Sequence, residues 1–369
     1  MKFTVNAEKC LAIVSDVAKG VGNNKLLPIT GMIGIEIADG KLQFSATDGA
    51  NILRISTEET SDEDGYVTVS ADMFVGLVSK LADCSAISFE STDKVLAITG
   101  LKGIRPVGTY KLELPLNDEG KVVKFIDLDE KKNNTTGGAV YDIPVSVIEE
   151  MRNSCKQALA TDVSESCYAN YLVGDKIVST DRTRAVFVDS NVVDDKAHFL
   201  LGRNFVELLS LMEENVTLTV SSNGMYATDG HGTEVFSNMN GSIADYNETA
   251  IKGMLSMQFP SMCKIKKAEL INTLNRMTLF SSKFDNNGID IDFKDDKMVI
   301  KSVKGSAVEE IEYSEFANVQ PCDIRIDVLL LMSHIKAYAS DTVELFFGNP
   351  TCIKLVDGNV TQIIALVRK

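Results

Sequence analysis

The strongest constraint on this chain is a threefold repeat of a unit that mixes helices with hairpins. Each copy contains two amphipathic stretches, and each copy has short polar turns between alternating strands. The six stretches are 7–19, 72–83, 145–159, 203–214, 264–283 and 325–340. Corresponding turn lysines, Lys41, Lys176 and Lys297, lie 135 and 121 residues apart. A repeat of this length has the size of a small domain and is too long for a solenoid, so it predicts three domains.

The spacing of apolar residues indicates the type of each element. In the stretch 145–159 they recur every three or four residues, which is typical of one face of a helix. In 33–44 and 289–300 they alternate around polar turns, which is typical of β-hairpins. The pattern predicts an α+β fold with two helices and antiparallel sheets in each domain. Two polar linkers place the domains at 1–125, 139–245 and 258–369.

Composition narrows the class of protein. No run of the 369 residues approaches the roughly 18 apolar residues that a membrane helix needs, and residues 1–5 read as a strand rather than a signal peptide. The seven cysteines form no Cys-x-x-Cys pair, which fits reduced thiols, and the three histidines lie far apart. We therefore expect a cytoplasmic protein without a metal site or cofactor.

The charge of the chain is unevenly distributed. A net charge of −15 argues against simple binding of nucleic acid. The six amphipathic stretches, however, hold 13 Lys and Arg against 11 Asp and Glu, a net charge of +2, which leaves −17 for the remainder. If all six helices lay on one surface, that surface would be nearly neutral to basic on an acidic body.

No catalytic motif is recognisable. The chain has no Gly-x-Gly-x-x-Gly, Walker loop, Gly-x-Ser-x-Gly or His-Glu-x-x-His. The nearest candidate, Thr-Asp-Gly-His-Gly at 228–232, is better explained as a turn between two strands. The sequence therefore nominates no catalytic residue and predicts a scaffold or binding protein rather than an enzyme.

Several short segments are weak signals alone but together extend over the whole chain. They are Met-Lys-Phe-Thr-Val at 1–5, Leu-Pro-Ile at 27–29, Ala-Asp-Gly-Lys-Leu at 38–42, Ala-Thr-Asp at 46–48, Ser-Thr-Asp-Arg-Thr-Arg-Ala-Val at 179–186, Asp-Tyr at 245–246, Leu-Phe-Ser-Ser-Lys-Phe at 279–284 and the tail 363–369. With these segments the chain resembles the bacterial sliding clamp family, the β subunit of DNA polymerase III.

The resemblance implies a processivity factor. Two chains would close head to tail into a ring around double-stranded DNA and tether the replicative DNA polymerase, with a clamp loader as a further partner. A non-catalytic structural or scaffold protein built from three repeats is the alternative, although it does not explain the matched spacings at both ends. A divergent or virus-encoded clamp fits the departures described below.

The resemblance also implies three sets of site residues. DNA-binding candidates, each of which could instead be a solvated surface charge, are Asn24, Lys25, Lys80, Arg152, Lys156, Arg203, Arg276 and Lys336. For the dimer interface, an edge strand with Tyr110, Leu112 and Leu114 would meet Thr278, Leu279 and Phe280; ordinary core roles are the alternative. The partner-peptide pocket would contain Thr180, Arg182, Thr183, Arg184, Ala185, Ala244, Ile363, Ile364, Leu366, Val367 and Arg368.

The pocket departs from the family pattern at four positions. Arg182 and Thr183 stand where the family has Gly-His, and Ala244 and Leu366 stand where it has proline. We therefore expect a reshaped pocket with its own peptide specificity.

Overall fold

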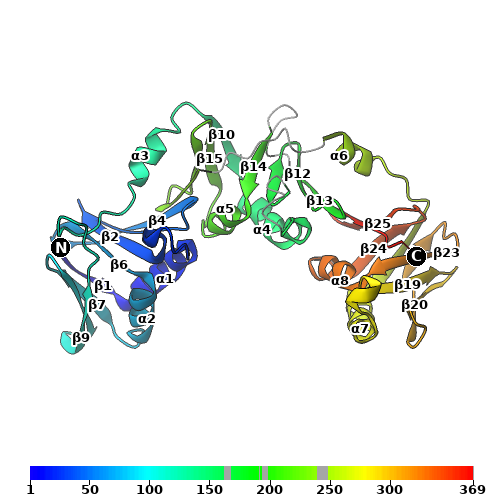
Figure 1. Ribbon diagram of the computed structural model, residues 1–369, viewed down its shortest axis with the longest axis horizontal. Coiled ribbons are helices and arrows are strands. Elements are labelled where there is room, and N and C mark those ends of the chain that lie inside the picture. The colour runs from blue at the N-terminus through cyan, green and yellow to red at the C-terminus, as the bar shows by residue number, and fades with distance from the viewer. Residues whose placement is uncertain (162–167, 191, 193–197, 239–247, 369) are drawn as a thin grey trace. The chain divides into compact units, whose positions relative to one another are not determined.

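The chain folds into two compact units (Figure 1). The computed structural model describes residues 1–161, 168–190, 192, 198–238 and 248–368. Unit 1 comprises Met1–Val145 and Asn204–Asn240, and unit 2 comprises Ser146–Arg203 and Gly241–Lys369. Each unit contains two sheets, and all strand pairs between described residues are antiparallel, which confirms the predicted α+β class. The three domain boundaries stay a prediction.

Unit 1 holds a five-stranded and an eight-stranded sheet. The first has the order β5-β1-β7-β8-β9: β5 Ser61–Glu63, β1 Lys2–Asn6, β7 Ala86–Ser91, β8 Val95–Lys102 and β9 Arg105–Glu113. The second has the order β10-β15-β16-β17-β4-β3-β2-β6: β10 Ala139–Ile143, β15 Val216–Ser221, β16 Gly224–Thr228, β17 Thr233–Ser237, β4 Asn51–Glu58, β3 Lys41–Thr47, β2 Met32–Ala38 and β6 Gly65–Ser70. The pairing of β17 with β4 joins the two segments of the unit.

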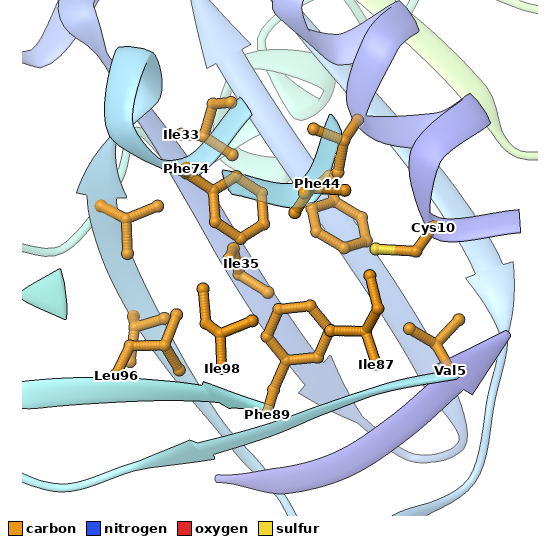
Figure 2. Close-up of a cluster of buried hydrophobic side chains, with 14 of the residues drawn as sticks. Val5, Cys10, Ile33, Ile35, Phe44, Phe74, Ile87, Phe89, Leu96 and Ile98 are labelled. Carbon is orange, nitrogen blue, oxygen red and sulfur yellow. The ribbon is translucent and has the colours of Figure 1, made fainter. Parts of the chain in front are cut away.

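Two helices pack side by side on the core of unit 1. They are α1 (Ala7–Val17), which continues into the short η1 (Ala18–Gly20), and α2 (Ala71–Lys80). Asn6 begins α1 because its side chain accepts a hydrogen bond from the backbone N–H of Lys9. Figure 2 shows the core beneath, where the ring of Phe74 lies near the rings of Phe44 and Phe89. The unit also contains η2 (Pro28–Gly31), α3 (Leu128–Asn133) and most of α5 (Arg203–Leu209).

Unit 2 holds a nine-stranded and a four-stranded sheet. The first has the order β14-β11-β12-β13-β26-β25-β24-β18-β22: β14 Phe199–Gly202, β11 Asn170–Val173, β12 Lys176–Thr180, β13 Arg184–Asp189, β26 Val360–Ala365, β25 Cys352–Asp357, β24 Thr342–Phe347, β18 Ser261–Lys266 and β22 Glu315–Ala317. The second has the order β21-β20-β19-β23: β21 Val308–Glu312, β20 Lys297–Ser302, β19 Gly288–Phe293 and β23 Cys322–Asp327.

The helices of unit 2 include an adjacent pair, α7 (Lys267–Met277) and α8 (Val328–Lys336). The side chain of Asp327 begins α8 by accepting hydrogen bonds from two backbone N–H groups. The other described helices are α4 (Val145–Asn153), α6 (Glu248–Leu255) and the short η3 (Cys155–Ala158), η5 (Thr278–Phe280) and η6 (Lys283–Asp285).

All six predicted amphipathic stretches contain a helix, but several are shorter than expected. The stretch 264–283 begins in strand β18, where alternate residues are buried, so its first lysines belong to a sheet. Helices α3 and α6 occur in segments that the sequence analysis interpreted as linkers. With the observed bounds, the six predicted helices carry seven Lys and Arg and seven Asp and Glu, a net charge of zero rather than +2. The acidity of the chain still lies outside them.

Candidate functional site

One face of the nine-stranded sheet carries an apolar cluster that helix α6 partly covers. Its buried members are Leu172, Val178, Ala185, Phe187, Leu200, Cys352 and Ile363. Five partly buried side chains pack against them: Tyr168, Ile251, Met254, Met257 and Phe259. We call these twelve residues the α6 cluster. The five partly buried side chains leave part of this apolar surface accessible to solvent.

The predicted pocket residues are divided between the two faces of this sheet. Thr180, Ala185 and Ile363 occupy paired positions on the face of the α6 cluster. Arg184 and Ile364 pair with each other and, because side chains alternate along strands, point to the other face. There Ile364 is fully buried in the core beneath α7 and α8. Ala244 lies outside the described residues.

The turn between β12 and β13 holds a cation over the rim of this cluster. Asp181 organises the turn by accepting hydrogen bonds from the backbone N–H groups of Thr183 and Arg184 and from the Arg184 side chain. Arg182 has φ 72°, a left-handed conformation that favours glycine. Its guanidinium carbon lies 4.9 Å from the ring centroid of Tyr168, within range of a cation–π contact.

The C-terminal tail leaves β26 and bridges the two sheets of unit 2. The backbone N–H of Leu366 donates to the Thr351 carbonyl, and that of Val367 donates to the Arg325 carbonyl on β23, both at 2.8 Å. The Leu366 side chain packs against the core. Residues 366–368 also form one wall of a cleft of about 410 Å³. The tail therefore contributes to a groove, but on the β23 side rather than in the α6 cluster itself.

Three predicted DNA-binding residues converge on a second cleft in unit 2. Arg152 from α4, Lys156 from η3 and Lys336 from α8 line a hollow of about 640 Å³. The remaining lining residues are Asn153, Gln157, Ser333, Ala337, Tyr338 and Ala339, so the lining contains no carboxylate. A cleft with three cations and neutral donors is suited to a phosphodiester backbone.

Two more candidates lie together in unit 1. Asn24 and Lys25 line an open cleft with Lys19 and Asn204. The side chain of Asn24 accepts a hydrogen bond from the backbone N–H of Leu26, which fixes the turn. Asp48 and Glu207 also line this cleft, so it is less positive than the cleft around Lys336.

The other DNA-binding candidates are separate. Lys80 is exposed at the end of α2, and Arg203 is half-buried at the start of α5. Arg276 is exposed but donates two hydrogen bonds to the carboxylate of Glu309 on β21, which neutralises its charge. The roles of all eight candidates stay predictions.

The segments predicted for the dimer interface lie at the edge of a sheet and on an exposed turn. Strand β9 is an edge of its sheet and exposes Tyr110, but Leu112 and Leu114 belong to the core. Leu279 and Phe280 are 80% and 48% exposed, and they form a 3₁₀ turn rather than a strand.

Sequence reasoning missed a further edge strand, β21, at one end of the four-stranded sheet of unit 2. It carries Glu309, Glu310 and Glu312, of which the first two pair with Arg276 and Lys297, and β9 carries Arg105, Lys111 and Glu113. The unpaired backbone groups of an edge strand can pair with another chain. With five residues, three of them glutamates, β21 is too short and too charged for the sequence alone to indicate a strand.

A buried ionic network was also missed. Arg54 on β4 forms a bidentate pair with Asp129 of α3 at 2.8 and 2.7 Å and contacts Glu234 on β17 at 2.8 Å. Glu234 also accepts hydrogen bonds from Tyr226 and Lys132. Burial opposes the charge of Glu234, but these donors outweigh it and lower the pKa of its carboxyl. The network fastens the linker helix α3 to the eight-stranded sheet.

The described residues contain no group of His, Cys, Asp and Glu able to hold a metal ion. His334 is buried against Gln362, and burial lowers its pKa to about 4, so it is neutral at pH 7. The segment 228–232 connects β16 to β17 as a turn, as predicted. No helix among the described residues is long and apolar enough to cross a membrane.

Comparison with known proteins gives a consistent result. Residues 1–105 match the family described as DNA polymerase III beta subunit, N-terminal domain. The beta sliding clamp of Staphylococcus aureus is 21% identical over 390 residues, covering 100% of this chain and 99% of that protein. The clamp of Chlamydia pneumoniae is 21% identical over 301 residues, covering 77% and 75% of the two chains.

Solved structures agree with the fold over the whole chain. DNA polymerase III subunit beta from Borrelia burgdorferi superposes with a TM-score of 0.84 at 16% identity, covering 100% of this chain and 99% of that one. The beta subunit from Streptococcus pyogenes gives 0.83 at 15% identity and covers both chains completely. The resemblance noted in the sequence is therefore confirmed: the chain is similar over its whole length to bacterial beta sliding clamps in sequence, and it has the fold of the β subunits of DNA polymerase III.

Proposed function

We propose that this protein is a DNA sliding clamp that encircles duplex DNA and tethers the replicative polymerase for processive synthesis. The observation that carries the proposal is that the fold agrees over the whole chain with the solved structures of DNA polymerase III β subunits. In this role two chains close head to tail, a clamp loader opens the ring, and the protein acts as a cytoplasmic, non-catalytic subunit of a polymerase holoenzyme.

The function is topological, which reconciles DNA binding with a net charge of −15. A closed ring need not bind DNA tightly, because escape requires the ring to open. Weak phosphate contacts at the cleft of Arg152, Lys156 and Lys336 permit sliding. The acidic remainder of the chain repels DNA elsewhere.

We expect retention on DNA to depend on the closure of the DNA. Protein loaded onto nicked circular DNA should stay bound through gel filtration in moderate salt, and it should leave within minutes once a restriction enzyme linearises the circle. Gel filtration of labelled protein measures this. Equal loss from circular and linear DNA would contradict topological binding, and circles with bound roadblocks at both sides of the cut serve as the control.

The basic cleft of unit 2 gives a second test. Changing Lys156 and Lys336 to Glu should slow loading and lower DNA occupancy several-fold at 50 mM salt, with a smaller effect at higher salt because phosphate contacts are screened. Lys41→Glu, an exposed site on β3, is the matched control. Loading assays across a salt series compare the double variant with the control. If both load equally well, the cleft does not contact DNA.

The dimer of this proposal uses the two open edges. Strand β9 of one chain would extend the sheet that ends in β21 of the other, with Leu279 and Phe280 packed beside the junction. The unpaired backbone groups of two edge strands support this arrangement, and the pair of Arg276 with Glu309 holds α7 against β21. A contact of this kind closes a ring when two copies satisfy it.

The partner site of this proposal is the α6 cluster, and the cleft beside the C-terminal tail is a separate candidate. An apolar floor with a few polar groups at its rim is suited to a short peptide from the polymerase or the loader. The alternative, a structural or scaffold protein built from repeats, is not favoured because the sliding clamp relatives match the chain over its full length.

A further inference from the structure

We propose that residues 251–259 form an autoinhibitory cover, which occupies the apolar floor of the α6 cluster in the free protein and which a partner peptide displaces on binding. We call this stretch the cover segment. The inference rests on the proposed role of the cluster as the partner site and adds how access to that site is controlled. It depends on the burial of the floor, on the origin of the side chains that cover it and on the stability of α6.

The floor of the α6 cluster is closed. Its seven buried side chains, which lie on strands β11, β12, β13, β14, β25 and β26, are each at most 5% exposed. An apolar peptide gains affinity when its side chains leave water and pack on an accessible apolar surface. This floor offers no such surface while other side chains cover it, so an apolar anchor reaches it only after the covering side chains have moved.

Most of the covering side chains come from one short stretch of the chain. Four of the five partly buried side chains that pack on the floor lie in the cover segment: Ile251, Met254, Met257 and Phe259. The five residues between them are exposed, so the segment has a single apolar side. Helical and extended peptides bind grooves through apolar anchors spaced along one side in this way. The cover segment therefore has the form of a peptide ligand and occupies the place of one.

The contacts of the cover segment with its surroundings are ones that another apolar peptide can replace. Sδ of Met257 lies 3.3 Å from Sγ of Cys352, and the ring centroid of Phe259 lies 5.3 Å from the ammonium nitrogen of Lys354. A side-chain hydrogen bond from Asn349 to a backbone carbonyl of the segment is long, at 3.4 Å. Methionine side chains are flexible and adapt to different neighbours, which favours an exchange of one apolar ligand for another.

Helix α6 has little stability of its own. It has eight residues, and one of them is Gly253 at an exposed position. Helices shorter than about 12 residues are marginal in water, and glycine weakens a helix further. Packing of its apolar side on the floor therefore supplies most of the stability of α6, and the helix loses this support when a peptide takes the floor.

A labelled peptide with the sequence of residues 250–260 tests the inference. In the parent protein the cover segment competes with this peptide from within the same chain, at a high effective concentration. In the Ile251→Asp/Met254→Asp double variant, the charged side chains cannot remain on an apolar floor. Fluorescence polarisation with the full chain should therefore show about tenfold tighter binding to the double variant than to the parent.

A stabilised helix should have the opposite effect. Gly253→Ala should weaken binding of the peptide about two- to fourfold relative to the parent, because alanine favours the helix that has to leave. Gly76→Ala is the matched control: each glycine is the sixth residue of its helix, each is exposed, and an added Cβ would meet no atom within 4 Å at either position. This control should leave the affinity unchanged.

Amide exchange gives a readout whose sign separates a cover from a wall. In the parent protein, millimolar peptide should speed the exchange of amides 251–255, because a displaced α6 loses its helical hydrogen bonds. If α6 were instead a fixed wall of the site, the bound peptide would protect these amides. This measurement and the Gly253→Ala comparison use chains with an intact cluster, so they decide the question even if the double variant does not fold.

The outcomes are distinguishable. Equal binding to the parent and the folded double variant, unchanged affinity in Gly253→Ala, or slower exchange in α6 with peptide bound overturns the inference while the cluster remains a peptide site. Binding to none of the folded proteins overturns both the inference and the assignment of the cluster as the partner site. Retention on circular DNA, measured separately, would still support the clamp itself.

Discussion

Replacement of Leu279 and Phe280 by Asp is expected to convert dimers of this protein into monomers. The two side chains are 80% and 48% exposed on the turn that follows α7, the helix that pairs with β21 through Arg276 and Glu309, so they contribute little to the fold of their own chain. In a dimer they would be buried, and each fully buried apolar side chain of this size is worth about 1.5–3 kcal/mol. Placing two carboxylates there removes that gain and adds the cost of burying charge.

Multi-angle light scattering at micromolar concentration measures the change. The control is Leu26→Asp, because Leu26 is 89% exposed in unit 1 and lies outside both open edges. It should remain dimeric. A double variant that stays dimeric would remove Leu279 and Phe280 from the interface, and dissociation of both variants would indicate a general effect of added charge.

The Arg54→Met variant is expected to lose about 1.5–3 kcal/mol of stability in unit 1, since it removes charged hydrogen bonds to the buried Glu234, which keeps only Lys132 and Tyr226 as donors. The side chains of Arg54 and Glu234 are 9% and 14% exposed, so water cannot replace the lost contact. Asp129 would also lose its bidentate partner, which releases helix α3 from the sheet. Urea denaturation, with amide exchange followed in β4 and β17, measures the loss.

The same variant should change the dependence of stability on pH. In the parent protein the pKa of Glu234 lies below its usual 4.5, so its stabilising effect is complete above pH 4.5 and disappears as the pH falls through the lowered value. Without Arg54, the pKa of Glu234 should be higher than in the parent protein, because one of the groups that lower it is gone, and unfolding by acid should begin at a higher pH. Lys121→Met, which breaks an exposed pair with Glu119, should change neither stability nor acid unfolding appreciably.

The sequence by itself determined the repeated elements and the class of the fold. Periodicity fixed the helices and hairpins because local spacing decides which side chains can share a face. It also located the turn at 228–232, which follows from local pattern, whereas Leu279 and Phe280 were nominated for an interface by the resemblance alone. The limits of helices were less accurate: β18 pairs with β24, and that pairing outweighed the helical pattern of 264–283.

Only the tertiary structure decided which distant residues act together. Arg152 and Lys336 come from helices far apart in the sequence, and nothing local shows that they share one cleft. Alternation in β26 assigns Ile363 to the α6 cluster and Ile364 to the core, a distinction that depends on strand register. Helix α3 is too short to be stable alone and is held by Arg54, so a polar linker in the sequence is an ordered element in the fold.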